Sequence, residues 1–559
     1  MQENNIKDTY DSVPYTSNPF AISSIFRLEA IAKMSGFEPA PHEKCRVLEL
    51  GCSFGGNLMM SALRCPDSEF IGIDLSSEQI ERGSKIVEQM GIKNLKLIQG
   101  DISQIATGGG GNREFGKKFD YIIVHGIYSW VPDFVKDAIF EVGKNYLSPH
   151  GLIYISYNTY PGWKGKDVLR DLMLFAASNE TALSIAAAKD IAKAEIDANG
   201  ELSAKNKLAM AKGFCTALVD FSEKIGQDEC YKLGISRHTI NFAKEHVLTN
   251  NPEKDYYVMH EYFETFNDPC YFKDFVAKAR SHGLDYVADT HLQSHFSQIF
   301  EAIPAGMMPN DRIIKEQFGD FLLNKAFRCS ILGLKESVLE LFKAGGGLDG
   351  GVKKSVLESL YLQAGFEYQN SPDGKLEIIS KLNKAHKINP ELKWLCDEFN
   401  ALYPGTLSLK DLLEKYSQKQ DIIWASVAHL LALGVIDFSA APLRVLGYEG
   451  AKTRVKESLR GYISYFANTD APVIGAANEL NALISLSPLE AKVALLCDGR
   501  DLGKVLKGFK DIIKSSGQSL VQVRNGKQEK IEAPNDAVFK GFLDNILEKL
   551  SNAGYFEKI

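Results

Sequence analysis

One short glycine-containing segment constrains the fold of this 559-residue chain more than any other. It reads Leu-Glu-Leu-Gly-Cys-Ser-Phe-Gly-Gly-Asn from Leu48 to Asn57, so that an apolar stretch continues directly into a loop with Gly51 and Gly55. Glycine in such a loop lets a ligand lie against bare backbone, which a side chain would block. The segment therefore predicts a buried strand followed by a turn that leaves room for a ligand.

Apolar runs of strand length alternate with helical segments around this loop. The runs cover residues 46–50, 70–74, 95–99, 119–124 and 152–157. Alternation of this kind is typical of an α/β fold with a mostly parallel sheet. We therefore expect a Rossmann-like domain in which the glycine loop follows the first strand.

Acidic residues follow the next two strands at the positions that a nucleoside-containing cofactor needs. Asp74 ends the second strand, where a carboxylate can accept both ribose hydroxyls. Asp101 follows Gly100 after the third strand, where it can reach an adenine amino group while Ile102 flanks the ring. The spacing from Gly51 is Gly-x-x-x-Gly, looser than the Gly-x-Gly-x-x-Gly of enzymes that place a pyrophosphate over a helix N-terminus. S-adenosylmethionine (SAM) has no phosphate, so the ordered set predicts a SAM-binding class I methyltransferase domain, with a nicotinamide-dependent oxidoreductase as the competing interpretation.

The predicted cofactor-binding residues come from the N-terminal segment, the glycine loop and the ends of the first four strands. They are Tyr15, Glu49, Gly51, Cys52, Gly55, Asn57, Asp74, Leu75, Gly100, Asp101, Ile102 and His125. No metal site is predicted, because the nine cysteines are scattered without a Cys-x-x-Cys pair. The same scatter gives no disulfide framework and fits a reducing compartment.

Two aromatic segments follow the fourth and fifth strands, at the sheet edge where open α/β folds bind ligands. The first begins His125-Gly-Ile-Tyr-Ser-Trp-Val-Pro, and the second, Tyr-Asn-Thr-Tyr-Pro-Gly-Trp, ends at Trp163. Neither holds the Asn/Asp-Pro-Pro-Tyr turn typical of methyltransferases that act on DNA bases or glutamine amides, which disfavours those acceptors. The predicted catalytic residues are Tyr160, His125, Trp163 and Tyr128. Packing beneath a lid is the alternative for Tyr157, Tyr160 and Trp163, and a non-catalytic role is the alternative for His125.

A lysine acceptor would give these aromatic segments a chemical task. Methyl transfer is an in-line displacement, so the protein has to align donor and acceptor and supply a deprotonated nucleophile. With an ordinary pKa of ~10.4, roughly one lysine in a few thousand is neutral at pH 7, a deficit of about 4 to 5 kcal/mol. An aromatic channel lowers that pKa by desolvation, and a neighbouring Tyr or His can relay the proton.

Composition disfavours several classes of partner. The net charge of −7, without a run of Lys and Arg, argues against nucleic acid. No apolar window approaches the ~18 to 20 residues that span a bilayer, and the first residues lack the pattern of a secretory signal. We therefore expect a cytoplasmic protein without membrane insertion. The sequence leaves open whether it forms a homo-oligomer.

The length predicts about three or four folding units. We expect an N-terminal cap over residues 1–40, with a helix at 22–34, and the SAM-binding domain over 41–166. A helical middle domain should cover 167–340. Beyond the glycine-rich boundary Lys-Ala-Gly-Gly-Gly-Leu-Asp-Gly-Gly, a mainly helical domain should cover 341–559. Within it, residues 406–440 read helix, loop, helix and short strand, which predicts a winged-helix module.

Read in order, these motifs resemble bacterial methyltransferases that carry a methyltransferase regulatory domain. The matching stretches are Tyr-Asp-Ser-Val-Pro-Tyr at 10–15, the glycine loop, the two aromatic segments, His-Glu-Tyr at 260–262 and Cys-Tyr-Phe-Lys-Asp-Phe-Val-Ala-Lys-Ala-Arg at 270–280. Segments from 316 to 329 and from 473 to 506 also look like that family. The group includes protein-lysine methyltransferases of outer-membrane proteins.

The resemblance implies a three-part enzyme whose helical middle domain covers the acceptor side and whose carboxyl-terminal domain helps hold a protein substrate. We expect a SAM-dependent methyltransferase that acts on lysine amino groups of a protein. A small-molecule or lipid-linked acceptor, and a SAM-sensing regulatory protein, are the alternatives. His260 and Glu261 are candidates for an acid/base pair, with a helix packing contact as the alternative.

Overall fold

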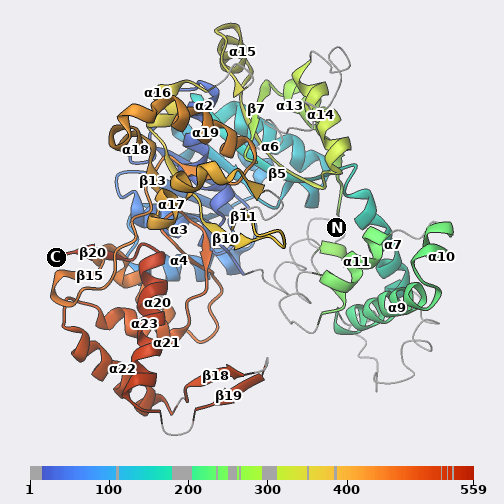
Figure 1. Cartoon of the computed structure of the whole chain (residues 1–559). Coiled ribbons are helices and arrows are strands. Elements are labelled where there is room, and N and C mark those ends of the chain that lie inside the picture. Colours follow the sequence, from blue (N-terminus) through green and yellow to red (C-terminus); the bar gives the residue numbers. More distant parts are fainter. Residues whose placement is uncertain are drawn as a thin grey trace.

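The computed structural model describes residues 16–108, 113–178, 204–233, 237–249, 258, 261–263, 266–291, 311–348, 352–382, 387–517, 519–524, 527–531 and 534–559. A central sheet is flanked by helices. A helical lobe and the C-terminal elements stand apart from each other around it (Figure 1).

The sheet has eight strands in the order β3-β2-β1-β4-β5-β8-β7, with β6 paired to β5. Its first five strands are parallel: β1 (Arg46–Leu50), β2 (Glu69–Asp74), β3 (Leu95–Gln99), β4 (Phe119–Val124) and β5 (Leu147–Tyr160). The first four confirm the predicted runs, whereas β5 contains the predicted run 152–157 and extends beyond it at both ends. Helices cover both faces, so the central strands read as continuous apolar runs. Because the strands are parallel, the glycine loop, Asp74 and Asp101 emerge at one edge.

The sheet does not end near residue 166, where the sequence places the end of the SAM-binding domain. The remaining strands are β6 (Cys270–Tyr271), β7 (Leu284–Asp289) and β8 (Phe327–Leu334). β8 lies antiparallel between β5 and β7 and fills the far edge of the sheet. The segment predicted as a helical middle domain therefore contributes strands to the same sheet. The boundary between the two units stays a prediction.

Helices pack on the two faces of the sheet as two layers. They are α2 (Ile25–Ser35), α3 (Gly56–Arg64), α4 (Ser77–Met90), α5 (Ile102–Ala106), α6 (Asp133–Tyr146), α13 (Phe272–Ser281) and α14 (Arg312–Leu323). The predicted N-terminal helix is α2, which begins where Ser24 accepts a hydrogen bond from Arg27 N and ends at Gly36 with φ 91°.

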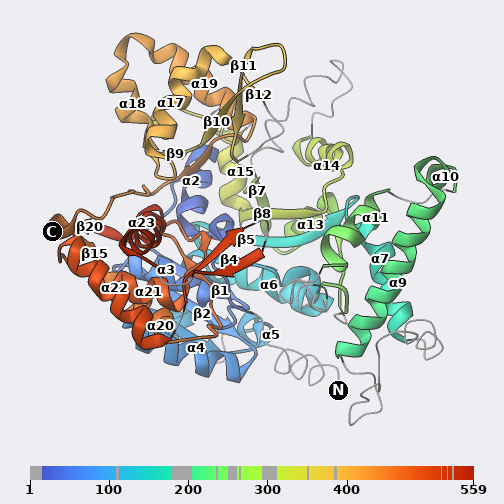
Figure 2. The same cartoon turned by 60° about the horizontal axis from the view of Figure 1, so that its bottom comes forward.

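A separate lobe of helices leaves the sheet directly after β5. It contains α7 (Lys164–Ser178), α9 (Ala204–Ile225), α10 (Gln227–Lys232), α11 (Arg237–Phe242) and a π-helical turn (Ala243–Val247). Its apolar residues form their own cluster, distinct from the two clusters on the sheet. Figures 1 and 2 show these helices grouped to one side of the sheet. The predicted helical character of this region is confirmed.

The C-terminal elements share a hydrophobic core with the sheet. Up to Ser439 they are α15 (Lys335–Lys343), α16 (Lys354–Glu358), β9 (Tyr361–Gln363), β10 (Phe366–Asn370), β11 (Leu376–Ser380), β12 (Lys387–Ile388), α17 (Lys393–Leu402), β13 (Leu407–Ser408), α18 (Leu409–Lys415), α19 (Gln420–Ala432) and β14 (Asp437–Ser439). Beyond it they are β15 (Thr453–Val455), α20 (Arg460–Ala467), β16 (Ala476–Ala477), β17 (Leu483–Ile484), α21 (Pro488–Leu496), α22 (Leu502–Ser516), β18 (Val521–Arg524), β19 (Lys527–Lys530), α23 (Asp536–Asn552) and β20 (Phe556–Lys558). One continuous apolar cluster joins α2, one face of the sheet and these elements.

A close approach between α20 and α4 marks this shared core. A Cβ on Gly461 of α20 would lie 2.2 Å from the carbonyl oxygen of Met90 at the end of α4. Only glycine permits this spacing. Figure 2 shows α20 beside α4 in the same way.

The predicted winged-helix segment has the expected order of α18, α19 and β14. β14 pairs with β9, which also pairs with β13. The next strand along the described chain, β15, pairs with β20, so it does not form a wing with β14. The winged-helix interpretation stays a prediction. Within the part of the chain that the structure describes, no helix is long and apolar enough to cross a membrane; the cytoplasmic location also stays a prediction.

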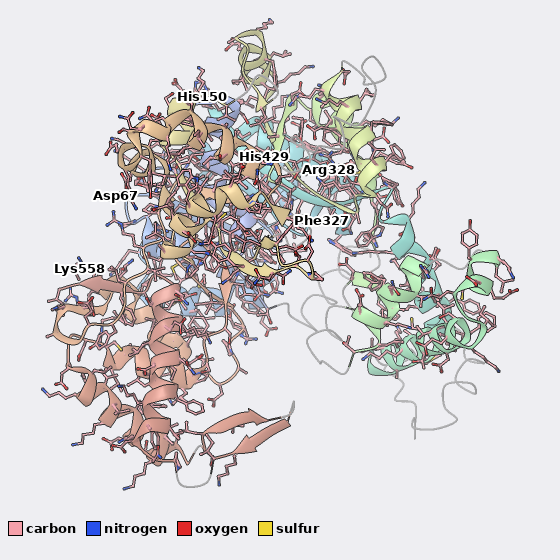
Figure 3. All side chains as sticks on the ribbon, in the orientation of Figure 1. Asp67, His150, Phe327, Arg328, His429 and Lys558 are labelled. Carbon is pink, nitrogen blue, oxygen red and sulfur yellow. The ribbon has the colours of Figure 1, made fainter. Side chains whose placement is uncertain are left out.

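A buried charge cluster fastens β8 to the helix before it. The Arg328 guanidinium, fully buried, donates to both oxygens of Asp320 at 2.9 Å and to Glu316 Oε2 at 3.0 Å (Figure 3). It lies 3.7 Å from the ring centre of Phe272, and Asp289 Oδ2 is 3.4 Å away. Opposite charges at these distances offset the cost of removing each from water.

We expect Arg328→Met to lower the free energy of unfolding by about 3–5 kcal/mol, because it leaves buried carboxylates without their cation. Lys393→Met, which breaks the exposed pair with Asp397 at 2.8 Å, should cost no more than about 0.5 kcal/mol. Urea denaturation of both variants measures the difference. Equal losses would mean that the buried cluster does not fasten β8.

Candidate functional site

A large cavity opens at the carboxyl edge of the parallel strands. Its volume is about 1700 Å³, and it runs from the end of β3 across the glycine loop to the start of α7. Among its walls are ten of the residues predicted to bind the cofactor: Glu49, Gly51, Cys52, Asn57, Asp74, Leu75, Gly100, Asp101, Ile102 and His125. The structure thus brings these residues together, and their role in binding stays a prediction.

The other two predicted cofactor residues are Gly55 and Tyr15. Gly55 does not line the cavity. It adopts φ +81° as the N-cap of α3, and a Cβ there would meet Leu97 at 2.9 Å, so its glycine serves the strand-to-helix turn. Tyr15 lies outside the described residues.

The glycine loop has the conformation that its sequence predicts. Gly51 has φ +73°, and a Cβ there would lie 2.3 Å from Ile127 Cδ1. Its backbone N–H, like that of Cys52, donates to Ile73 O on the neighbouring strand, at 2.8 and 2.9 Å. The loop is therefore fixed by main-chain bonds, and a side chain at position 51 would displace the Ile127 side chain, which follows β4.

Asp74 and Asp101 are each oriented by nearby donors. Asp74 accepts from Ser53 N at 2.8 Å and from Ser76 N at 3.0 Å. Asp101 accepts from the backbone and the hydroxyl of Ser103, both at 2.8 Å, and caps α5. These bonds hold each carboxylate at the cavity edge, where the ribose and adenine contacts are predicted.

Glu49 is the carboxylate deepest in the site. It is 4% exposed; Oε1 accepts from Asn57 Nδ2 at 2.7 Å, whereas the buried Oε2 has no hydrogen-bond partner among the described residues. Burial raises the pKa of Glu49 to about 8, against the hydrogen bond from Asn57, which lowers it. A buried carboxylate oxygen without a donor is costly unless a ligand supplies one. The α-ammonium group of SAM is such a donor, so the residues present fit this cofactor.

The C-terminal region completes this side of the cavity. Asn481 Nδ2 donates to both Asn57 O and Asn57 Oδ1 at 2.9 Å. Ser17 lies between the two regions: its N–H donates to Val473 O at 2.9 Å, and its hydroxyl accepts from Gly56 N at 2.9 Å. This contribution has no signal of its own in the sequence, where only a general family likeness marks residues 473–506. The cavity walls there are Leu483, Ile484 and Ser485.

The four predicted catalytic residues separate into two pairs. His125 and Trp163 line the cavity, whereas Tyr128 and Tyr160 do not. Tyr128 is 3% exposed and packs between aromatic rings that include Phe275, at 5.2 Å. The Tyr160 hydroxyl donates to Asp167 Oδ2 at 3.2 Å, and burial raises its pKa to about 12. The catalytic roles of these two tyrosines stay a prediction.

His125 faces the cavity as a neutral imidazole. Its Nδ1 is 2.9 Å from the Tyr154 hydroxyl, and the ring of Phe20 covers it at 3.9 Å between ring centres. Burial lowers the pKa of His125 to about 4. Near pH 7 a neutral imidazole can donate one hydrogen bond and accept another. Its low pKa makes it a weak base.

A charged and aromatic wall closes the far end of the cavity. Trp163, Lys166 and Glu261 line it together, and the exposed Phe327 belongs to the same cavity lining. Lys166 Nζ is 3.6 Å from Glu261 Oε1 and 4.1 Å from the centre of the Trp163 ring. Glu261 thus forms an ion pair with Lys166 in the cavity wall. His260 lies outside the described residues.

Comparisons with known proteins agree with this geometry. A family model described as a methyltransferase domain matches residues 41–200, and one described as a predicted methyltransferase regulatory domain matches residues 254–333. An uncharacterized protein of Rickettsia prowazekii (strain Madrid E) is 33% identical over 276 residues, which cover 49% of this chain and 94% of that protein. The chain belongs to the methyltransferases that carry a methyltransferase regulatory domain. SAM is accordingly the cofactor of this methyltransferase.

A second relative has a different length. Another uncharacterized Rickettsia prowazekii protein is 34% identical over 328 residues, or 58% of this chain, and the chain spans only 52% of it. The whole fold has a solved counterpart. The structure of PKMT2 from Rickettsia typhi in complex with AdoHcy has a TM-score of 0.73 at 21% identity, covering 97% of this methyltransferase and 100% of PKMT2. The regulatory-domain match includes β7 and β8, so in this methyltransferase that region completes the catalytic sheet.

The raised pKa of Glu49 gives a pH-dependent prediction. Because its folded pKa is about 8 against an ordinary 4.5, the stability linked to Glu49 is complete below pH 4.5 and lost as the pH rises toward 8. The side chain of Glu49→Gln does not titrate, so this variant does not lose stability over that range. Relative to the wild type, its free energy of unfolding should therefore rise between pH 4.5 and pH 8, by at most about 1.4 kcal/mol for each pH unit crossed. Its SAM affinity should fall. Urea denaturation at pH 5 and pH 8, with calorimetry of SAM binding, checks both; identical pH profiles would exclude a protonated Glu49.

The Asn481 contact predicts that SAM binding depends on the C-terminal region. Asn481 has φ +64°, so Asn481→Gly keeps the backbone and removes only the side chain that holds Asn57. We expect SAM affinity to fall about tenfold, the equivalent of one or two net hydrogen bonds. Asn324→Gly is the matched control, since Asn324 has φ +47° at the end of α14. Unchanged calorimetric affinity in Asn481→Gly would contradict the coupling.

Proposed function

We propose that this methyltransferase transfers methyl groups from SAM to lysine amino groups of a protein. The observation that carries the proposal is the continuity of the cavity from the cofactor residues to the wall of Trp163, Lys166 and Glu261. Its volume of about 1700 Å³ exceeds the ~300–1000 Å³ typical of a site for one small ligand. This leaves room for an acceptor side chain beside the cofactor.

The chemistry of the wall supports an amine acceptor. When bound, SAM supplies an electrophilic methyl group, and the chain's own residues must supply a neutral amine in line with it. An amine at this wall is partly removed from water. Burial lowers the pKa of Lys166, in spite of the opposing effect of Glu261. The same desolvation would lower the pKa of an acceptor lysine, so that its ammonium gives up a proton more readily, while His125 offers a neutral hydrogen-bonding ring.

Similarity to PKMT2 adds support at the level of the whole chain. The name PKMT2 denotes a protein-lysine methyltransferase, and its structure holds AdoHcy, the product that remains after SAM donates its methyl group. We propose further that the parts outside residues 41–166, namely the cap (1–40), the helical region (167–340) and the C-terminal region (341–559), hold the protein substrate around the SAM site.

The decisive experiment follows the label from tritiated SAM. The purified protein is incubated with a lysate that is then separated into protein, nucleic-acid and small-molecule fractions. We expect the label in protein, and acid hydrolysis should release it as methylated lysine. Glu49→Gln, with its weakened SAM affinity, is the control for background labelling. Label confined to small molecules, or to methylated residues other than lysine, would overturn the proposal.

A further inference from the structure

The far wall of the cavity has the composition of a binding site for an organic cation. Lys166 Nζ lies 4.1 Å from the ring centre of Trp163 and 5.2 Å from that of Phe242. Glu261 Oε1 is 3.6 Å from the same nitrogen. Two aromatic rings and one carboxylate around an ammonium combine cation–π attraction with an ion pair.

Burial makes this arrangement different from an ordinary surface ion pair. Trp163 is 1% exposed, and the side chains of Lys166 and Glu261 are 17% and 15% exposed. Attraction between a cation and a ring or carboxylate grows as water is excluded. The site is nevertheless open to ligands, because Trp163, Lys166 and Glu261 all line the cavity that holds the cofactor residues.

A second lysine nearby shows what is particular to this position. Lys164 Nζ also lies over two rings, those of Tyr160 and Tyr271, both at 5.5 Å. Lys164 is exposed, however, and does not line the cavity. Among the described residues that line the cavity, Lys166 is the only lysine.

We propose that Trp163, Phe242 and Glu261 form the recognition site for the alkylammonium group of the acceptor, and that Lys166 occupies this site in the free protein. The inference rests on the proposed function, because it takes the acceptor to be a lysine side chain. The Lys166 side chain has the same four-carbon stem and ammonium as that acceptor, so it pairs with the partly buried Glu261 until a substrate lysine replaces it.

Displacement follows from the cost of a buried charge. With Lys166 moved away, Glu261 would be left with less compensation in a desolvated site, which is unfavourable unless another cation enters. An incoming lysine restores the pair and releases Lys166 to water. Removal of the Lys166 charge should therefore strengthen the binding of an external lysine, while removal of the Glu261 charge should abolish that gain.

The test measures binding of N-acetyl-lysine methylamide to the full-length protein by saturation-transfer NMR, without SAM. We expect Lys166→Met to bind this compound at least tenfold more tightly than the wild type. Lys164→Met should bind like the wild type, and N-acetyl-norleucine methylamide, which lacks the ammonium, should show no gain. Lys166→Met combined with Glu261→Gln should lose the gain. Equal affinities in Lys166→Met and the wild type, or an equal gain for the norleucine compound, would overturn the proposal.

A measurement on the wild type keeps the test independent of variant folding. N-acetyl-trimethyllysine methylamide cannot react with amine reagents, so it can be added while lysines are acetylated. It should increase the acetylation of Lys166 several-fold, as read by mass spectrometry, and leave Lys164 unchanged. An unaltered Lys166 would contradict displacement. If the tritium experiment gives labelled methyl-lysine but none of these effects is seen, the proposed recognition site is refuted and the proposed function stands.

Discussion

The hydrogen-bonded chain from Asn481 through Asn57 to Glu49 is the interaction on which the rest of the site depends. Asn57 receives both bonds of the C-terminal Asn481 and passes one on to the buried carboxylate of Glu49. Amide groups are suited to this relay because each carries donors and an acceptor. The relay leaves Glu49 Oε2 as an acceptor for a ligand. A residue more than 400 positions along the chain thus helps orient the cofactor site.

The order of the strands explains why the helical lobe reaches the cavity. β5 ends at the carboxyl edge of the sheet, and the chain leaves the sheet there. It rejoins the sheet later, in β6, β7 and β8. The intervening helices form their own apolar cluster, yet Glu261 comes back to meet Lys166 at the cavity wall. The charge cluster of Arg328 then fastens the returning strand. The lobe and the edge of the sheet therefore both contribute residues to the wall of the same cavity.

Much of the fold and of the cofactor side could be predicted from sequence. Strands β1 to β4 lie within one residue of the predicted runs, because buried parallel strands are short, apolar and bounded by turn residues. Asp74 and the glycine loop were found because their spacing follows from the fold. The far wall of the cavity is harder to predict: Tyr128 and Tyr160 carry the same aromatic signal as Trp163 but do not line the cavity. Residue type alone does not tell a cavity wall from a core.

By itself the sequence determined the class of fold, the cofactor and the edge of the sheet where the cavity opens. These depend on local patterns, namely apolar periodicity, glycine at a strand end and acids at the next strand ends. Only the tertiary structure decided which distant segments complete the glycine loop and the far wall. Asn481 at the loop and Glu261 beside Lys166 arrive through long-range packing, in which contacts are set by the whole core and leave no local signature.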